Sequence, residues 1–410
     1  RSRRSRDAGS IIRHETGLAS SAGSPPLSND PCMNSSPWHR LPWSIVAVAV
    51  ALVMLGLLGL ARSADLTGGS NRYLVQQAVW AVLAAGVMLG LPWIGSRRLC
   101  RWSYAIFAVI LAMLVAVYFF PAVNGAHRWL RLGPLGLQPS EFAKVAFVIV
   151  LSRYLMHRDS HRRLAGLLMP VMIALVPVLL ILREPDLGTA MVFLPVLAIM
   201  LVVAGARGRD LVCYAALGLL VLPLLWSQMS REQRSRVTAL WEQTQAGQTP
   251  RDDTYQLHQA KRMLALGGVW GSLLGGQAVD DSAVYVLPES RTDFIFCLLG
   301  ERLGLWGLGI VLGLFGLLVW RGSMIARDCQ EPFGRLLAAG IAALFGVQVL
   351  INTGMTVGLL PVTGLSLPLV SYGGSGLLAH SVAVGLLLNV GLRPGYEMSG
   401  EAFRFRNDDV

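Results

Sequence analysis

Residues 43–61 read WSIVAVAVALVMLGLLGLA and carry no charged side chain. A helix of about 20 apolar residues is long enough to cross the hydrocarbon core of a bilayer. Similar apolar runs recur along the chain and predict ten membrane spans, so the expected fold class is an all-α polytopic membrane protein. The predicted spans lie near residues 43–61, 74–94, 102–120, 140–157, 164–182, 187–205, 210–226, 294–320, 333–353 and 374–392.

The composition points to the same class. Hydrophobic residues make up 54% of the 410 residues, charged residues only 14%, and the mean hydropathy is +0.54. A soluble domain carries about 25% charged residues. The net charge of +11 comes from arginines, many of them in short loops, where basic residues report membrane topology and not nucleic-acid binding.

The arginines also predict an orientation. With a cytoplasmic N-terminus, the inner loops hold twelve arginines and the short outer loops hold five, which favours both termini inside. The inner set is Arg97, Arg98, Arg101, Arg153, Arg158, Arg162, Arg163, Arg207, Arg209, Arg321, Arg327 and Arg335, and the outer set is Arg62, Arg72, Arg128, Arg131 and Arg183.

Three regions follow from these patterns. Residues 1–40 are rich in Arg, Ser and Pro and predict a disordered tail, within which Met33 is the expected true start. Residues 41–393 form the membrane domain, and residues 394–410 form a cytoplasmic tail. The one long loop, 227–293, is expected outside. Its apolar, Gly-containing part from Tyr255 to Gly271 is expected to lie back on the membrane domain or dip into the interface.

No metal centre or disulfide framework is predicted. The five cysteines form no CxxC pair. His157 and His161 are spaced i, i+4, but they stand among arginines and favour an ordinary charged loop over a metal site. No cofactor is indicated, and the sequence leaves open whether a divalent cation, Mg²⁺ or Mn²⁺, assists.

Four polar segments interrupt the apolar pattern, and all of them fall on the predicted outer side. They are 124–144, 183–189, 255–293 and 352–376. Polar groups at the mouth of a helix bundle predict a shared cavity more readily than four unrelated loops.

The first segment allows two interpretations, and the second is most simply explained by a helix cap. Arg128 and Lys144 stand near the amphipathic Trp129, a set suited to gripping a phosphate at the headgroup level. The alternative is interfacial snorkelling together with a Glu141–Lys144 pair. In the second segment Asp186 stands at a helix start, where a simple cap is the commonest role.

The third segment, LPESRTDFIF (287–296), passes from the outer loop into an apolar helix. Glu289 would share a face with Asp293 if the helix began early. The helix dipole favours an ionised Asp293, whereas burial would raise the pKa of its carboxyl, so the two effects oppose each other. Capping by Thr292 or Asp293 is the alternative.

The fourth segment, GLLPVTGLSLPLVSYGGSG (358–376), holds nineteen residues without a charge. Its prolines and the pair Gly373–Gly374 rule out a regular helix, which predicts a broken segment lining a cavity. Backbone amides from Ser371 to Ser375 could receive an anion at the next helix start. The alternative is a tight turn that closes the bundle.

Two absences narrow the chemistry. The chain has no GxxxxGK[ST] loop, and residues 373–377 fail the GxSxG pattern because Leu377 replaces the last glycine. Since ATP is not available outside the cell, a biosynthetic reaction there must draw on an activated bond in its substrate.

Taken together, the four segments resemble the SEDS family of peptidoglycan polymerases. The resemblance covers about residues 43–393 and rests on the motifs R-W-x-x-L-G, QPSEFAK, PDLGT, LPE-x-x-TDFIF and LP-x-x-G-x-x-LPLVSYGGS. PVTG at 361–364 is more typical of the RodA type, and GLSLP beside it of the FtsW type; the balance leans to the RodA type.

The resemblance implies a glycosyltransferase that joins lipid II units in the cytoplasmic (inner) membrane while undecaprenyl diphosphate leaves. The family's essential acid falls on Asp293, which becomes the general base on the acceptor 4-hydroxyl. The resemblance also implies a partner, a single-span class B penicillin-binding protein. The expected substrate contacts are Arg128 and Lys144 at the diphosphate, with Glu141, Asp186, Glu289, Ser371 and Ser375 as further substrate-binding groups.

The chain departs from the family pattern at several positions: Glu184, Arg291, Arg302 and Ser366. Arg291 stands where His is common, and a cation there would keep Asp293 ionised or bind a substrate phosphate. Two rival functions stay open. The cavity could move a lipid-linked precursor across the bilayer, as a flippase or transporter, or the protein could be a non-enzymatic scaffold for the partner synthase.

Overall fold

The computed structural model describes residues 41–67, 71–121, 127–132, 135–156, 164–209, 231–242, 252–275 and 289–393, together with four isolated positions. The predicted tails (1–40 and 394–410), the loop with His157 and His161, and most of the predicted span 210–226 lie outside these ranges. The count of ten spans and their orientation therefore stay predictions.

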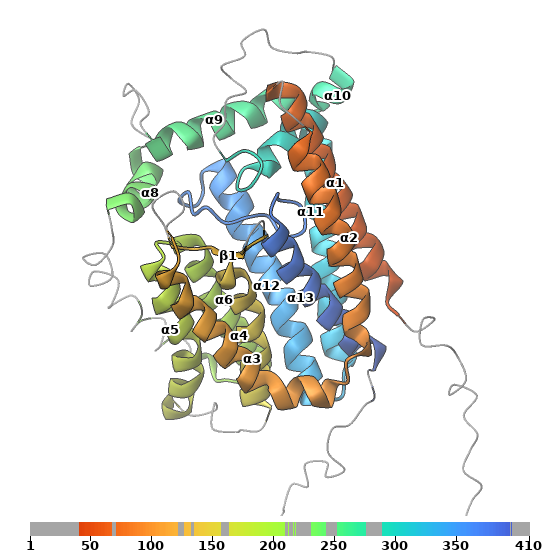
Figure 1. Ribbon diagram of the computed structural model, residues 1–410, viewed down its shortest axis with the longest axis vertical. Helices are drawn as coiled ribbons and strands as arrows, with labels where there is room; N and C mark the ends of the chain where they lie inside the picture. Colours follow the sequence, from red (N-terminus) through yellow and green to blue (C-terminus); the bar gives the residue numbers. More distant parts are fainter. Residues whose placement is uncertain are drawn as a thin grey trace, which may run out of the picture. The chain divides into compact units, whose positions relative to one another are not determined.

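Helices stand at all the other predicted spans (Figure 1). They are α1 (Trp43–Thr67), α2 (Arg72–Gly90), α3 (Ser96–Ala116), α4 (Pro139–Leu155), α5 (Leu168–Arg183), α6 (Leu187–Val203), α11 (Ile295–Asp328), α12 (Pro332–Val357) and α13 (Gly374–Leu392). Short 3₁₀ turns η3 (Leu91–Trp93) and η4 (Val117–Phe119) extend α2 and α3, and η6 (Leu164–Leu167) precedes α5. Six helices in the described ranges are long and apolar enough to cross a membrane.

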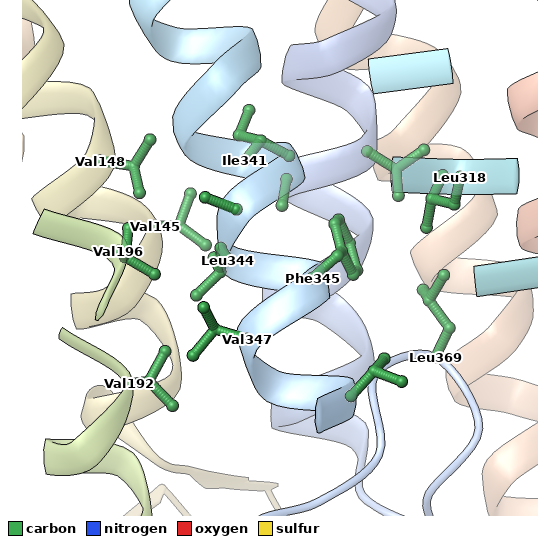
Figure 2. Close-up of a cluster of buried hydrophobic side chains, with 14 of the residues drawn as sticks. Val145, Val148, Val192, Val196, Leu318, Ile341, Leu344, Phe345, Val347 and Leu369 are labelled. Carbon is green, nitrogen blue, oxygen red and sulfur yellow. The ribbon is translucent and has the colours of Figure 1, made fainter. Parts of the chain in front are cut away.

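Three helices form the centre of the membrane domain. In α4 only Phe142 and Arg153 escape burial, and α4, α12 and α13 contact one another. Figure 2 shows side chains of α4 (Val145, Val148), α6 (Val192, Val196) and α12 (Leu344, Val347) filling the space between these helices, and Phe345 on the other face of α12, on the side of Leu318 and Leu369. By contrast, only 17% of the most apolar stretch is buried in α2, and the same share in α3, which leaves apolar faces of both helices for lipid.

Helix α11 is two helices joined at a break. Gly304 has φ 66° and ψ −166°, so a separate short helix, 295–303, precedes the long one. A Cβ on Gly304 would lie 2.4 Å from the backbone nitrogen of Gly271, and Leu305 N–H donates to the carbonyl of Gly268 at 3.0 Å. Only glycine allows this close approach of two backbones at a positive φ.

Three helices of the long loop are described: α8 (Arg231–Glu242), α9 (Asp252–Gly267) and α10 (Gly271–Gly275). Helix α9 packs across the ends of α11 and α12 (Figure 1). Leu257, Ala260 and Met263 on its inner face are fully buried. Helix α9 therefore packs on the membrane domain, which is one of the two arrangements expected for residues 255–271; the outer location of the loop stays a prediction.

One element corrects the all-α prediction. Strands β1 (Leu130–Leu132) and β2 (Leu135–Leu137) pair antiparallel, with Leu130 opposite Leu137. Gly136 allows the ring of Trp129 to lie against the hairpin, since a Cβ there would be 3.3 Å from that ring. Strands of three residues give too short an alternation to stand out from a membrane protein's apolar background.

Candidate functional site

A cavity of about 460 Å³ lies where the four polar segments meet, as predicted. The loop side of the cavity, defined here as Arg128, Arg236, Glu289 and Asp293, is built from loops and from α8. The helix side, defined as Glu141, Gly376 and His380, comes from α4 and α13. The wall between them includes Trp129, Gln138, Thr189, Thr292, Gly364, Ser366, Ser371, Tyr372 and Gly373.

Asp293 is held in place through its backbone. The carbonyls of residues 291–293 accept hydrogen bonds from three different donors: Tyr372 N–H at 2.9 Å, the Ser371 hydroxyl, and Asn352 Nδ2 at 2.9 Å. The nitrogens of residues 292–294 all donate to the carbonyl of Glu289. Hydrogen bonds to both the carbonyls and the nitrogens of this segment therefore determine where the carboxyl of Asp293 enters the cavity.

Burial has the largest effect on the carboxyl of Asp293. The pKa of its carboxyl is raised to about 7, first by burial and then by the neighbouring carboxylate of Glu289. The Thr292 hydroxyl and the cation of Arg236 act in the opposite direction, and Asp186 adds a smaller upward effect. A carboxyl with a pKa near the ambient pH is suited to general acid–base catalysis.

Arg128 reaches the cavity from the segment that leads into β1, two residues before Leu130. Its Nε donates to the carbonyl of Glu184 at 2.8 Å and its Nη2 to the carbonyl of Pro185 at 2.7 Å. Both acceptors are neutral carbonyls, so they position the guanidinium without neutralising its charge. This geometry leaves a cation at the cavity wall, as the sequence predicted.

Arg236 is a cavity residue that the sequence did not single out. Its Nη1 and Asp293 Oδ2 each lie 3.4 Å from the place of a Cβ on Gly364, so the guanidinium and the carboxyl approach the same glycine. Gly364 has φ +70° and no side chain to separate them. Arg236 is one of several arginines in a polar stretch of the loop, and nothing in that pattern marks it out.

Glu141 and Lys144 form the predicted pair. Lys144 Nζ donates to Glu141 Oε1 at 2.9 Å, and both side chains are almost fully buried. His380 Nε2, which the sequence did not single out either, lies 3.7 Å from Glu141 Oε2. Lys144 is not among the residues that line the cavity, and its contact with the diphosphate stays a prediction that this geometry does not favour.

Asp186 and Ser375 hold the framework around the cavity. Asp186 caps α6, accepting from Thr189 N–H at 3.1 Å and from the Thr189 hydroxyl at 2.9 Å. The Ser375 hydroxyl accepts from Gln138 N–H at 2.9 Å. Neither residue lines the cavity, so the geometry favours support over direct substrate contact. Glu289 lines it, and its Oε2 accepts from the Thr292 hydroxyl at 3.1 Å.

Three of the five amides in the expected anion site at the start of α13 are already engaged, and the site stays a prediction. The amides of Ser371, Tyr372 and Gly373 already donate to the carbonyls of Leu367 and Arg291 and to the side chain of Gln77. The Ser371 hydroxyl lines the cavity, but it donates to the carbonyl of Thr292 and accepts from Leu367 N–H. These groups are used to fix the broken segment, which leaves few amides for an anion.

Arg291 also departs from expectation. Its Nε donates to the Ser63 hydroxyl at 2.8 Å, and its guanidinium lies 4.4 Å above the ring of Tyr73. It neither lines the cavity nor contributes to the shifted pKa of Asp293. The cation near Asp293 comes from Arg236 instead.

Comparison with known proteins decides the family. The family model of the FtsW, RodA and SpoVE cell cycle proteins matches residues 39–393. The chain belongs to the FtsW/RodA/SpoVE family. A family relative named a probable peptidoglycan glycosyltransferase FtsW, from Geobacter sulfurreducens, is 36% identical over 88% of this chain and 98% of its own length. The peptidoglycan glycosyltransferase MrdB of Escherichia coli is 33% identical over 86% and 93%.

Solved structures of the FtsW/RodA/SpoVE family agree. A chain from a structure described as a peptidoglycan synthase complex that coordinates polymerization and crosslinking matches with a TM-score of 0.73 and 32% identity, covering 86% of this chain and 97% of that one. The rod shape determining protein RodA of Thermus thermophilus matches with a TM-score of 0.64 and 29% identity, covering 88% and 100%.

Proposed function

We propose that this protein is a peptidoglycan glycosyltransferase that polymerises lipid II into glycan strands on the outer face of the cytoplasmic membrane. One observation carries the proposal: a carboxyl with a pKa of about 7, Asp293, faces a 460 Å³ cavity beside the cation of Arg236. Family membership and relatives named peptidoglycan glycosyltransferases support the same reaction.

Asp293 acts as the general base in this proposal. Its carboxylate takes the proton from the acceptor 4-hydroxyl as the oxygen forms a bond to the anomeric carbon of the lipid-linked donor. The bond from that carbon to the diphosphate oxygen breaks, and the electron pair leaves with undecaprenyl diphosphate. Attack opposite the leaving group inverts the anomeric centre. The proton on Asp293 then passes to solvent before the next turnover.

The two arginines of the loop side receive the diphosphate. Arg128 is held by neutral carbonyls, and Arg236 stands beside the base, so both cations can stabilise charge that develops on the leaving group. Within the described residues, no group of three or more His, Cys, Asp or Glu side chains is arranged to hold a metal ion. We therefore propose that any divalent cation, Mg²⁺ or Mn²⁺, arrives with the substrate diphosphate.

The membrane placement is part of the proposal. The apolar runs predict ten spans, and the arginine distribution favours a cytoplasmic location of both termini; with that orientation the cavity would open on the outer side. A class B penicillin-binding protein is the proposed partner, supported by the likeness to a chain of a peptidoglycan synthase complex. Relatives carry both the FtsW and the MrdB name. Depletion of the protein from cells distinguishes the two roles: rounded cells would indicate a role in elongation, and filamentous cells a role in division.

The test uses purified full-length protein in nanodiscs, alone and with its partner made transpeptidase-dead. Labelled lipid II is added, and glycan chains are resolved on a gel. We expect polymer from the wild type. Lipid II flipping in vesicles with no polymer would support the transporter, and neither activity would support the scaffold.

A further inference from the structure

The helix side of the cavity holds a buried acceptor that lacks a donor. Glu141 is 5% exposed and lines the cavity. Its Oε1 accepts from Lys144 Nζ at 2.9 Å, but its Oε2 has no hydrogen-bond partner. His380 Nε2 is 3.7 Å from Oε2, beyond hydrogen-bond distance, and lies 3.3 Å from Gln348 Oε1.

A glycine leaves a recess beside this acceptor. A Cβ on Gly376 would lie 3.6 Å from Glu141 Oε2 and 3.9 Å from Ser366 Oγ. Both Gly376 and Ser366 line the cavity. The missing side chain thus opens a small space that is bordered by a carboxylate oxygen and a hydroxyl.

The chemistry of this recess selects a ligand with hydrogen-bond donors. An unsatisfied buried acceptor costs about 1–3 kcal/mol, and a ligand O–H or N–H would recover that energy. The diphosphate of lipid II is esterified at both ends and carries no hydroxyl proton at neutral pH, so it cannot supply the missing donor. Sugar hydroxyls and the N–H of an acetamido group supply the required donors.

We propose that Glu141 Oε2, Ser366 and the space above Gly376 form a subsite for a sugar hydroxyl or acetamido group of the substrate. This inference rests on the proposed function and deepens it by orienting the substrate. The diphosphate lies at the loop side with Arg128 and Arg236, and the saccharide extends toward α4 and α13. The two sides of the cavity therefore bind different parts of one molecule.

The test fills the recess with a single methyl group. Gly376→Ala places its Cβ at ordinary contact distances, so the fold is preserved. The matched control is Gly346→Ala in α12, at a position that does not line this cavity and where the nearest atoms would be 3.7 and 3.9 Å away. Binding of fluorescent lipid II to full-length protein is measured directly, and undecaprenyl diphosphate serves as a sugar-free competitor.

We expect Gly376→Ala to raise the Kd for lipid II about tenfold, the loss of one hydrogen bond to a charged group. The inhibition constant of undecaprenyl diphosphate should stay within about twofold, because that ligand lacks the sugar. Ser366→Ala should weaken lipid II binding in the same selective way. An unchanged Kd in Gly376→Ala, or equal weakening of both ligands, overturns the subsite. Failure of the wild type to make polymer instead refutes the proposed function, since this binding assay needs no turnover.

Discussion

The two sides of the cavity are charged in different ways. On the helix side, Glu141 is neutralised by Lys144, which stands one helical turn further along α4 and does not itself line the cavity. On the loop side, Arg128 is held by backbone carbonyls, and Asp293 is flanked by Glu289 and Arg236.

The difference follows from how deep each side lies. An uncompensated charge among membrane helices is costly, so the helix side keeps its charges paired and offers only a polar acceptor. Nearer the loops, cations can stay available for an anionic ligand. We conclude that bond making takes place at the loop side and that the helix side contributes recognition.

Removal of the base should have the largest effect. We expect Asp293→Asn to lower kcat about a hundred- to ten-thousandfold, because the amide cannot accept the acceptor's proton. The measurement is the initial rate of glycan formation from labelled lipid II. Asp328→Asn, at the exposed end of α11, serves as the control. A rate within about threefold of the wild type would remove Asp293 from the chemistry.

Loss of the hydrogen bond that holds the backbone of Asp293 should have an intermediate effect. Asn352 Nδ2 donates to the carbonyl of Asp293 at 2.9 Å and to that of Leu365 at 2.6 Å. Asn352→Leu leaves both buried carbonyls without this donor and lets the base shift. We expect kcat to fall about ten- to a hundredfold with little change in KM.

The neighbouring Thr353→Val is the matched control for that variant. It removes only a hydrogen bond within α12, from the Thr353 hydroxyl to the carbonyl of Val349. A rise in KM with unchanged kcat for Asn352→Leu would place Asn352 in substrate binding and contradict the positioning role.

The smallest effect on activity is expected at Glu184. This residue is fully buried in the turn before α6, and burial followed by the charge of Asp186 raises the pKa of its carboxyl to about 8. At pH 7 the side chain is therefore mostly protonated and resembles glutamine. Glu184→Gln should keep the polymerisation rate within about twofold.

The same substitution should change how stability depends on pH. The folded protein retains the Glu184 proton up to about pH 8, whereas the unfolded chain loses it near 4.5. The protonated Glu184 carboxyl contributes fully to the stability of the wild type below pH 4.5, the pKa in the unfolded chain. That contribution is lost as the pH rises through about 8, the pKa in the folded protein. Glu184→Gln should therefore raise Tm at pH 8 and leave it unchanged at pH 4, as measured by thermal unfolding in detergent. A lower Tm at pH 8 would mean that the carboxyl is charged and paired.

Much of the fold could be predicted because apolar runs of about 20 residues have few alternatives in a membrane. The segment from 358 to 373 is non-helical, as its prolines and glycines indicated. The break at Gly304 could not be predicted, since it depends on the approach of the Gly268–Gly271 backbone, far away in the chain. The periodicity of apolar residues predicts single helices but not contacts between segments that are distant in the sequence.

The site shows the same limit. Glu141, Asp293 and Arg128 stood out because charged or polar residues interrupt apolar sequence. Arg236 could not be singled out because it lies in the polar first half of the long loop. Asn352 opens the fourth polar segment but is one of several polar residues there, and His380 lies in a predicted span where it gives no periodic signal. The expectation that Arg291 lies near the carboxyl of Asp293 was wrong, because side chains close in sequence can point in different directions. The side chain of Arg291 contacts Ser63 and Tyr73 instead.

The pH dependence of kcat/KM for lipid II shows whether Asp293 is the base, since it reports the protonation of the free enzyme's base. The base must be deprotonated, and the pKa of Asp293 is about 7. We therefore predict that the rate rises with pH up to about 7 and then levels off. Loss of the cation in Arg236→Gln should raise the pKa of Asp293 further and move this rise to higher pH. A rate independent of pH between about 6 and 8, or a rise that stays in place in the variant, would contradict the account.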